Sequence, residues 1–290
     1  MLATMHGKEA AIAPVLLERL GLALSTAPDL DTDALGTFTG EIPRAGAMRD
    51  AAVAKARLGM GATGLPIGIA SEGSYGPHPH VPLMAGGIEI LVLVDDTRRI
   101  VLSEVLVHDA PVYDHAFATT ISELGPYLDR TGFPDQALIV KPSDTRIEAG
   151  PIYKGLRCKD DLAQAITRCA ARSSEGRALV QTDMRAHMNP TRMATLSRLA
   201  IAFVERLATS CPACGMPGYG QVDVETGLPC DACGAPSIMV RHRLFGCVMC
   251  SHREMRPRPD GRAHADPRHC PECNPCSANG GRAVPTPTRR

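Results

Sequence analysis

The sequence has few of the features that mark membrane proteins or nucleic-acid-binding proteins. It contains no tryptophan, and five tyrosines and five phenylalanines make up only 3% of its 290 residues. Few aromatic rings are therefore available to stack on bases, and the core must be filled by aliphatic side chains. Basic and acidic residues are equal in number, 31 of each, so net charge favours no polyanionic partner. No apolar run approaches the roughly 20 residues that span a bilayer.

The N-terminus also lacks the pattern of a secretion signal. Lys8 and Glu9 interrupt it early, and no basic segment precedes a long apolar stretch. We therefore expect a cytoplasmic protein with no membrane partner. Because the cytosol keeps thiols reduced, the 11 cysteines are expected to bind metal rather than to form disulfides.

Helical and strand-like patterns alternate up to about residue 209, which predicts an α/β, mixed-sheet layered domain over residues 1–209. Strands are expected over 1–5, 22–27, 65–73, 136–142 and 177–183, with a hairpin over 87–109. Helices are expected over 9–22, 41–60, 117–132, 159–173 and 189–208.

The composition changes at Ser210, where glycine and proline become frequent and nine of the cysteines follow. This pattern predicts a small second module over residues 210–277 that resembles zinc ribbons. Residues 278–290 have the composition of a disordered tail. Nothing in the pattern indicates the oligomeric state.

The second module contains four C-x-x-C pairs. Such a pair chelates one ion from a tight turn, and two pairs about 15–20 residues apart form the tetrahedral sulfur site that Zn²⁺ prefers. Glycine follows two of the pairs, as Gly215 and Gly234, and suits a turn around a metal. We expect two structural zinc ions bound by the eight cysteines of these pairs, which are Cys211, Cys214, Cys230, Cys233, Cys247, Cys250, Cys270 and Cys273.

The spacing leaves the pairing of the four motifs open. Consecutive pairs could form two sequential sites, or the pairs could interleave, and Cys276 could replace Cys273. Either arrangement closes the site to substrate, so the metal would supply folding free energy rather than catalysis. Arginines outnumber acids from Arg241 onward, which makes nucleic-acid contact through this module possible.

The stretch "ATMHGKEAAI" begins at Ala3 and places a glycine and Lys8 between a strand and a helix. Free backbone N–H groups at a helix start, together with a lysine, can hold an anion. The alternative is the ordinary first turn of an α/β domain.

Further charged residues lie at the ends of other predicted elements. Glu41 and Arg44 stand at a helix start with Lys55 three turns on, and Glu72 follows a strand among glycines. In "TDMRAHMNPTRM", Arg185 and Arg192 lie at a strand-to-helix junction, where a capped helix with ion pairs is the alternative. Carboxylates that hold Mg²⁺ and cations that hold phosphate are what hydrolysis of a phosphoanhydride requires. The expected catalytic residues are Glu41 and Glu72, and the expected phosphate-binding residues are Lys8, Arg44, Lys55, Arg185 and Arg192.

These segments resemble the inosine/xanthosine triphosphate pyrophosphatase-like superfamily over about residues 1–110. The opening strand–turn–helix, the helix with Thr39, Glu41, Ala45 and Lys55-Ala56, and the acidic strand end "GIASEG" carry the resemblance. It implies that Lys8 contacts phosphate, that Glu41 and Glu72 bind Mg²⁺, and that Lys55 supports the site.

The whole chain also resembles an uncharacterised bacterial domain-of-unknown-function family with the same "GIASEGSYGPHP", "TDMRAHMNPTRM" and "CPAC" stretches. That resemblance implies no established activity. The segments "ALIVKP", "YKGLRCKDDLAQAI" and "TDMRAHMNP" resemble, more distantly, the order of segments in ATP-grasp enzymes.

Two functional hypotheses follow. The first is a Mg²⁺-dependent hydrolase of a nucleotide or related phosphoanhydride with structural zinc, acting on a small phosphorylated ligand. The second is a non-catalytic zinc-binding adaptor that contacts nucleic acid or protein, with the α/β domain as a ligand sensor.

Overall fold

The structure is a computed structural model that describes residues 1–27, 30, 46–78, 84–144 and 150–274. The chain divides into two compact units, Met1–Glu205 and Arg206–Arg290. Among the residues singled out from the sequence, Glu41, Arg44 and Cys276 lie outside the described residues, as does the segment 278–290.

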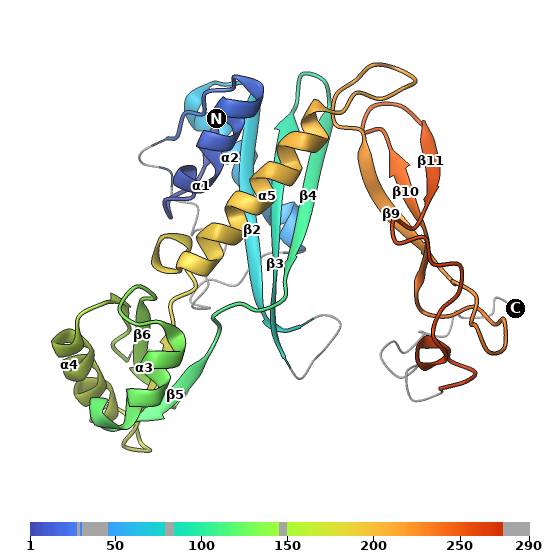
Figure 1. The fold of residues 1–290 in the computed structure, drawn as a ribbon. Helices are drawn as coiled ribbons and strands as arrows, with labels where there is room; N and C mark the ends of the chain where they lie inside the picture. Colours follow the sequence, from blue (N-terminus) through green and yellow to red (C-terminus); the bar gives the residue numbers. More distant parts are fainter. Residues whose placement is uncertain (28–29, 31–45, 79–83, 145–149, 275–290) are drawn as a thin grey trace, which may run out of the picture. The chain divides into compact units, whose positions relative to one another are not determined.

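The first sheet of the larger unit has the strand order β1-β2-β3-β4, of which Figure 1 labels β2, β3 and β4. Its strands are β1 (Leu2–Ala3), β2 (Ile67–Pro77), β3 (Ala85–Asp95) and β4 (Ile100–His108). β1 runs parallel to β2, whereas the other neighbours are antiparallel. The sheet is therefore mixed, as the sequence predicts.

Helices cover both faces of this sheet. α1 (Glu9–Leu20) follows β1, and α2 (Met48–Thr63) packs its small residues Ala52 and Ala56 against Ile90 and Val92 of β3. Side chains alternate between faces along a strand, so Glu89 points to the opposite face. There it meets α5 (Pro190–Ala208), which crosses β2, β3 and β4 in Figure 1. The result is a three-layered α/β arrangement.

A second sheet of the same unit has the order β5-β8-β6-β7, with every neighbouring pair antiparallel. Its strands are β5 (His115–Ala118), β6 (Leu138–Pro142), β7 (Tyr153–Leu156) and β8 (Ala178–Thr182). One face, with Val140 and Val180, packs in a common core with Leu162 and Ile166 of α4 (Lys159–Ala170). The short helix α3 (Gly125–Thr131), which follows the 3₁₀ turn η2 (Ile121–Leu124), contributes Tyr127 and Leu128 to that core.

The smaller unit is built on a three-stranded antiparallel sheet of order β11-β10-β9. Its strands are β9 (Gly220–Thr226), β10 (Val240–Gly246) and β11 (Arg253–Pro257), and the 3₁₀ turn η4 (Pro267–His269) follows them. The turn η3 (Ala186–Met188) precedes α5 in the larger unit. None of the helices within the described parts of the chain has the length and apolar character needed to cross a bilayer.

The fold class is confirmed, but three predicted elements differ from the structure. Residues 22–27 form no strand, and only Thr26 makes an isolated bridge, to Leu2. The helix expected over 41–60 begins at Met48 and runs past Gly59 and Gly61 to Thr63. Residues 117–118 belong to β5, because they pair with β8, and the helical turns begin only at residue 121.

Gly68 on β2 allows α2 to approach the sheet. A Cβ at this position would lie 2.6 Å from the backbone oxygen of Ala56, whereas a Cβ at Gly76 on the same strand meets nothing within 4 Å. We expect Gly68→Ala to destabilise the chain by about 1–3 kcal/mol, because the α2 backbone must shift, and Gly76→Ala to leave stability nearly unchanged.

Urea unfolding followed by helical circular dichroism measures this difference, because α1 to α4 and most of α5 lie in the larger unit. Equal unfolding midpoints for the two variants would contradict the close packing of α2 on β2.

Candidate functional site

Eight cysteines gather into two tetrads in the smaller unit. Within each tetrad the four Sγ atoms lie within 4.8 Å of one another. The first consists of Cys211, Cys214, Cys247 and Cys250, and the second of Cys230, Cys233, Cys270 and Cys273. The motifs therefore interleave, the first pair with the third and the second with the fourth.

The spacing of the sulfur atoms fits zinc. The Sγ atoms of Cys211 and Cys250 are 3.8 Å apart, and those of Cys233 and Cys270 are 3.6 Å apart. Four sulfurs at the usual Zn–S distance of about 2.3 Å form a tetrahedron with edges of about 3.8 Å. All four donors in each tetrad are thiols, so no position is left for a substrate.

The first two motifs each form a turn, and the two turns have the same backbone conformation. The amide of Gly215 donates to the carbonyl of Cys211, and that of Gly234 donates to the carbonyl of Cys230, each at 2.9 Å. Both glycines have φ near +70°, at 71° and 73°, a conformation that other residues rarely adopt. In the third motif, the amide of Met249 donates to the Sγ of Cys247 at 3.3 Å. Each turn points its thiols at one position.

The strand pairing explains the interleaving. β9 and β10 are antiparallel, and Gly220 at the start of β9 faces Gly246 at the end of β10. The motif before β9 therefore meets the motif after β10. The other two motifs meet at the opposite end of the sheet, where β9 ends and β11 leads on to Cys270. No histidine belongs to either tetrad in the described part of the module.

The predicted pair Lys55 and Glu72 is brought together in the larger unit. Their side chains form an ion pair and are only 10% and 6% exposed. Glu72 stands opposite Ile90 in the β2–β3 register and so shares the face that packs on α2. The two groups expected to serve a ligand therefore neutralise each other inside the protein.

Lys8 lies at the edge of the same strand. Its Nζ donates to the carbonyl of Ser71 at 3.0 Å, just beyond the last β1–β2 partners, Ala3 and Ala70. Burial lowers the pKa of Lys8 to about 8, and the positive charge of Arg192 acts in the same direction, while Glu89 and Glu72 oppose it. Lys8 thus joins Lys55 and Glu72 in one buried charged cluster.

Arg192 lies on the opposite face of the sheet, where it pairs with Glu89. Its Nε is 2.6 Å from Glu89 Oε1, both side chains are fully buried, and a second guanidinium nitrogen donates to the carbonyl of Met184. The hydroxyl of Tyr75 donates to the same carboxylate oxygen at 2.6 Å. Although desolvation acts to lower the pKa of Arg192, the Glu89 charge raises it above its ordinary value. Glu89 lies within the apolar strand "GIEILVLVDD", and the sequence pattern there did not predict its role.

Arg185, the other arginine of the predicted clamp, does not reach this pair. Its guanidinium bonds to the fully buried Asp183, with a shortest distance of 2.7 Å. The amide of Gly155 also donates to Asp183, at 3.1 Å. The segment between β8 and α5 is therefore held by ion pairs and a helix cap, since the amide of Arg192 donates to Asn189 Oδ1.

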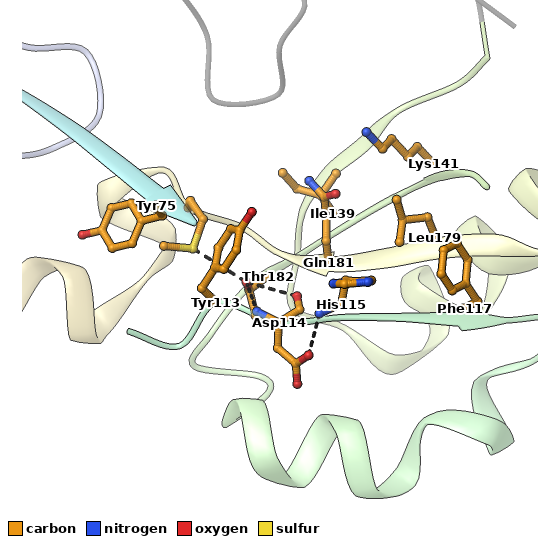
Figure 2. A pocket seen from close by; sticks show the side chains of 11 residues that line it. Tyr75, Tyr113, Asp114, His115, Phe117, Ile139, Lys141, Leu179, Gln181 and Thr182 are labelled. Atoms are coloured by element: carbon orange, nitrogen blue, oxygen red, sulfur yellow. Dashed lines mark hydrogen bonds between the residues drawn. The ribbon is translucent and has the colours of Figure 1, made fainter. Parts of the chain in front are cut away.

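A pocket of about 360 Å³ lies beside this network (Figure 2). Tyr75 forms one wall, and other walls include Tyr113, Phe117, Lys141, Gln181 and Met184. The sequence patterns did not predict this pocket. The signal that could have indicated it was the alternation in "HAFA", "LIVKP" and "ALVQT", which places aromatic, amide and lysine side chains on one face of the second sheet.

The buried state of Lys8 makes the stability of the chain depend on pH. Below pH 8 the lysine is charged in both the folded and the unfolded states. Between pH 8 and its ordinary pKa of 10.5 the folded state loses the proton first, so the free energy of unfolding rises with pH. We expect the wild type to gain up to about 3 kcal/mol relative to Lys8→Met across this interval.

Urea unfolding of both proteins at several values from pH 7 to 10.5 measures this gain, because the two proteins share every other titratable group. A difference that is constant across the pH range would mean that Lys8 remains hydrated in the folded protein.

The chain is similar to one protein family. A family model described as a domain of unknown function, DUF6671, matches residues 55–275, from α2 through the second cysteine tetrad. No curated protein and no solved structure matches the chain. Since the family model spans most of the sequence, the chain belongs to the DUF6671 family.

Proposed function

We propose that this chain is a zinc-folded adaptor in which two structural zinc ions hold the C-terminal module and the α/β unit binds a small ligand. The observation that carries the proposal is the pair of all-cysteine tetrads with sulfur spacings of tetrahedral zinc sites.

The small core of the module supports a structural role for the metal. Its buried apolar cluster consists of Cys211, Tyr219 and Cys247, with Met216 and Phe245 packed against it. Two of the three buried members are metal-ligand candidates, so the thiols occupy the place of an aliphatic core. A unit of this size without metal buries too little apolar surface to offset the entropy of ordering the chain.

The surface of the module favours a protein partner over nucleic acid. Arg256, Arg258 and Arg268 pair with neighbouring acids. These carboxylates reduce the positive potential that would attract phosphate. Exposed apolar side chains, among them Val222 and Met255, are instead the kind of surface that protein partners cover.

Hydrolysis of a phosphoanhydride is the second candidate. It is supported by the gathering of Lys8, Lys55 and Glu72 around one segment of β2. The burial of this cluster and its internal ion pair favour a structural role instead, because a catalytic carboxylate must reach Mg²⁺. The catalytic role of Glu41 and the phosphate-binding role of Arg44 remain predictions.

The zinc proposal makes a prediction about metal content. We expect two zinc ions in the wild-type chain. The double variant Cys211→Ser/Cys247→Ser should keep about one, because both residues serve one tetrad, whereas Cys211→Ser/Cys230→Ser should lose both. Elemental analysis after exhaustive buffer exchange measures the content, with Cys158→Ser, which changes an exposed cysteine outside the tetrads, as the control.

A second measurement covers the case in which losing one ion unfolds the whole module. Partial zinc removal followed by thiol alkylation should expose Cys211, Cys214, Cys247 and Cys250 together, as one set. Joint release of Cys211 with Cys230 would contradict the interleaved pairing, and a chain without zinc would refute the proposed function.

The choice between adaptor and hydrolase is tested by phosphate or pyrophosphate release from nucleoside di- and triphosphates with Mg²⁺. We expect background rates from both the wild type and Glu72→Gln, because Glu72 is buried against Lys55. Glu18→Gln, at an exposed position on α1, serves as the matched control. A Mg²⁺-dependent rate in the wild type and Glu18→Gln that is lost in Glu72→Gln would favour the hydrolase.

A further inference from the structure

The face of the second sheet that turns away from its helix-packed core carries an ordered set of side chains. In the strand register, His115, Gln181 and Ile139 form one row across β5, β8 and β6, and Phe117, Leu179 and Lys141 form the next. The alternating residues on the other face pack into the core with α3 and α4. Functional groups from three strands therefore share one surface.

This surface is the floor of the pocket of about 360 Å³, and Tyr75 and Tyr113 stand at one side of it in Figure 2. The volume falls within the range of small-molecule sites. The side chain of Tyr75 is held in position, since its hydroxyl donates to Glu89 at 2.6 Å and the Arg192 guanidinium lies 5.4 Å from its ring centre. At least one wall is therefore held in place before any ligand binds.

Two aromatic rings of the pocket are exposed. Tyr113 is 43% exposed and Phe117 is 40% exposed, in a chain that has only ten tyrosines and phenylalanines. The Arg177 guanidinium lies 4.9 Å from the Phe117 ring centre, and His115 meets the ring edge-on at 6.0 Å. Phe117 is thus oriented by its neighbours, and flat apolar rings of this kind stack well on planar heterocycles.

The charges of the pocket favour an anionic ligand. Lys141 forms no ion pair with any described residue, and Arg177 adds a second positive charge nearby. The acid that lines the pocket, Asp114, is already paired with Arg130 at 2.8 Å. The Gln181 amide bonds to no other described side chain and offers both a donor and an acceptor.

We propose that this pocket binds a nucleoside monophosphate. The base stacks against Phe117, the Gln181 amide hydrogen-bonds to an edge of the base, and the Lys141 ammonium pairs with the phosphate. The inference deepens the ligand-binding part of the function proposed above and names its ligand class. It uses none of the residues of the buried cluster around Lys8.

Isothermal titration of the intact, zinc-loaded chain with AMP, GMP, CMP and UMP tests the proposal. At least one should bind at a single saturable site. Lys141→Ala should weaken that binding about tenfold or more, because the phosphate loses its partner, and should leave binding of the matching nucleoside unchanged. Phe117→Leu should weaken nucleotide and nucleoside alike by about 5- to 150-fold, because a stacked base is lost.

Lys159→Ala, an exposed lysine at the start of α4, is the matched control and should bind as the wild type does. Phe117→Tyr retains the ring and should restore stacking. Zinc content and the urea midpoint of each variant separate a pocket defect from misfolding, so failure here is distinguishable from failure of the zinc proposal. The inference is overturned if none of the four nucleotides saturates, if Lys141→Ala and Phe117→Leu bind normally, or if only a single-stranded oligonucleotide binds.

Discussion

The α/β unit depends on the requirement that a charge removed from water be paired. The Arg192 guanidinium is completely buried, and removing one partner of such a pair costs about 3–5 kcal/mol. Glu89 on β3 and the Met184 carbonyl supply its partners, so one side chain joins α5 to the first sheet and to the segment after β8. Gly73 leaves room for the pair, since a Cβ there would lie 2.6 Å from both charged groups. Tyr75 bonds to the same carboxylate and so connects the buried pair to the pocket.

The smaller unit differs from the larger one in what fills its interior. Its apolar cluster is small, and thiols take up much of it. The three-stranded sheet acts mainly as a spacer that carries one cysteine tetrad at each end. Metal coordination by the tetrads would contribute the free energy that a larger core provides in other proteins, and would allow such a unit to remain short.

Sequence patterns predicted the long, strongly periodic elements and failed where a neighbour decided the outcome. Residues 22–27 have strand-like composition, yet their side chains are mostly exposed and only Thr26 bridges to β1. The local pattern predicts a helix at residues 117–118, but pairing with β8 places them in a strand, because tertiary pairing overrides local propensity. The catalytic and phosphate-binding roles expected for the charged residues stay predictions. Their partners were not predictable, because Glu89 and Arg192 are 103 residues apart in the chain.

The sequence by itself determined the α/β class of the first part and the paired thiol groups of the second, since these follow from local periodicity and from the short spacing within each C-x-x-C pair. Only the tertiary structure decided which cysteine pairs share a site, because that depends on which strand ends meet in an antiparallel sheet. It also decided that Lys55 and Glu72 neutralise each other and that a pocket forms elsewhere. The physical reason is common to these cases: spacing along the chain fixes local geometry, whereas burial and pairing are set by contacts between distant segments.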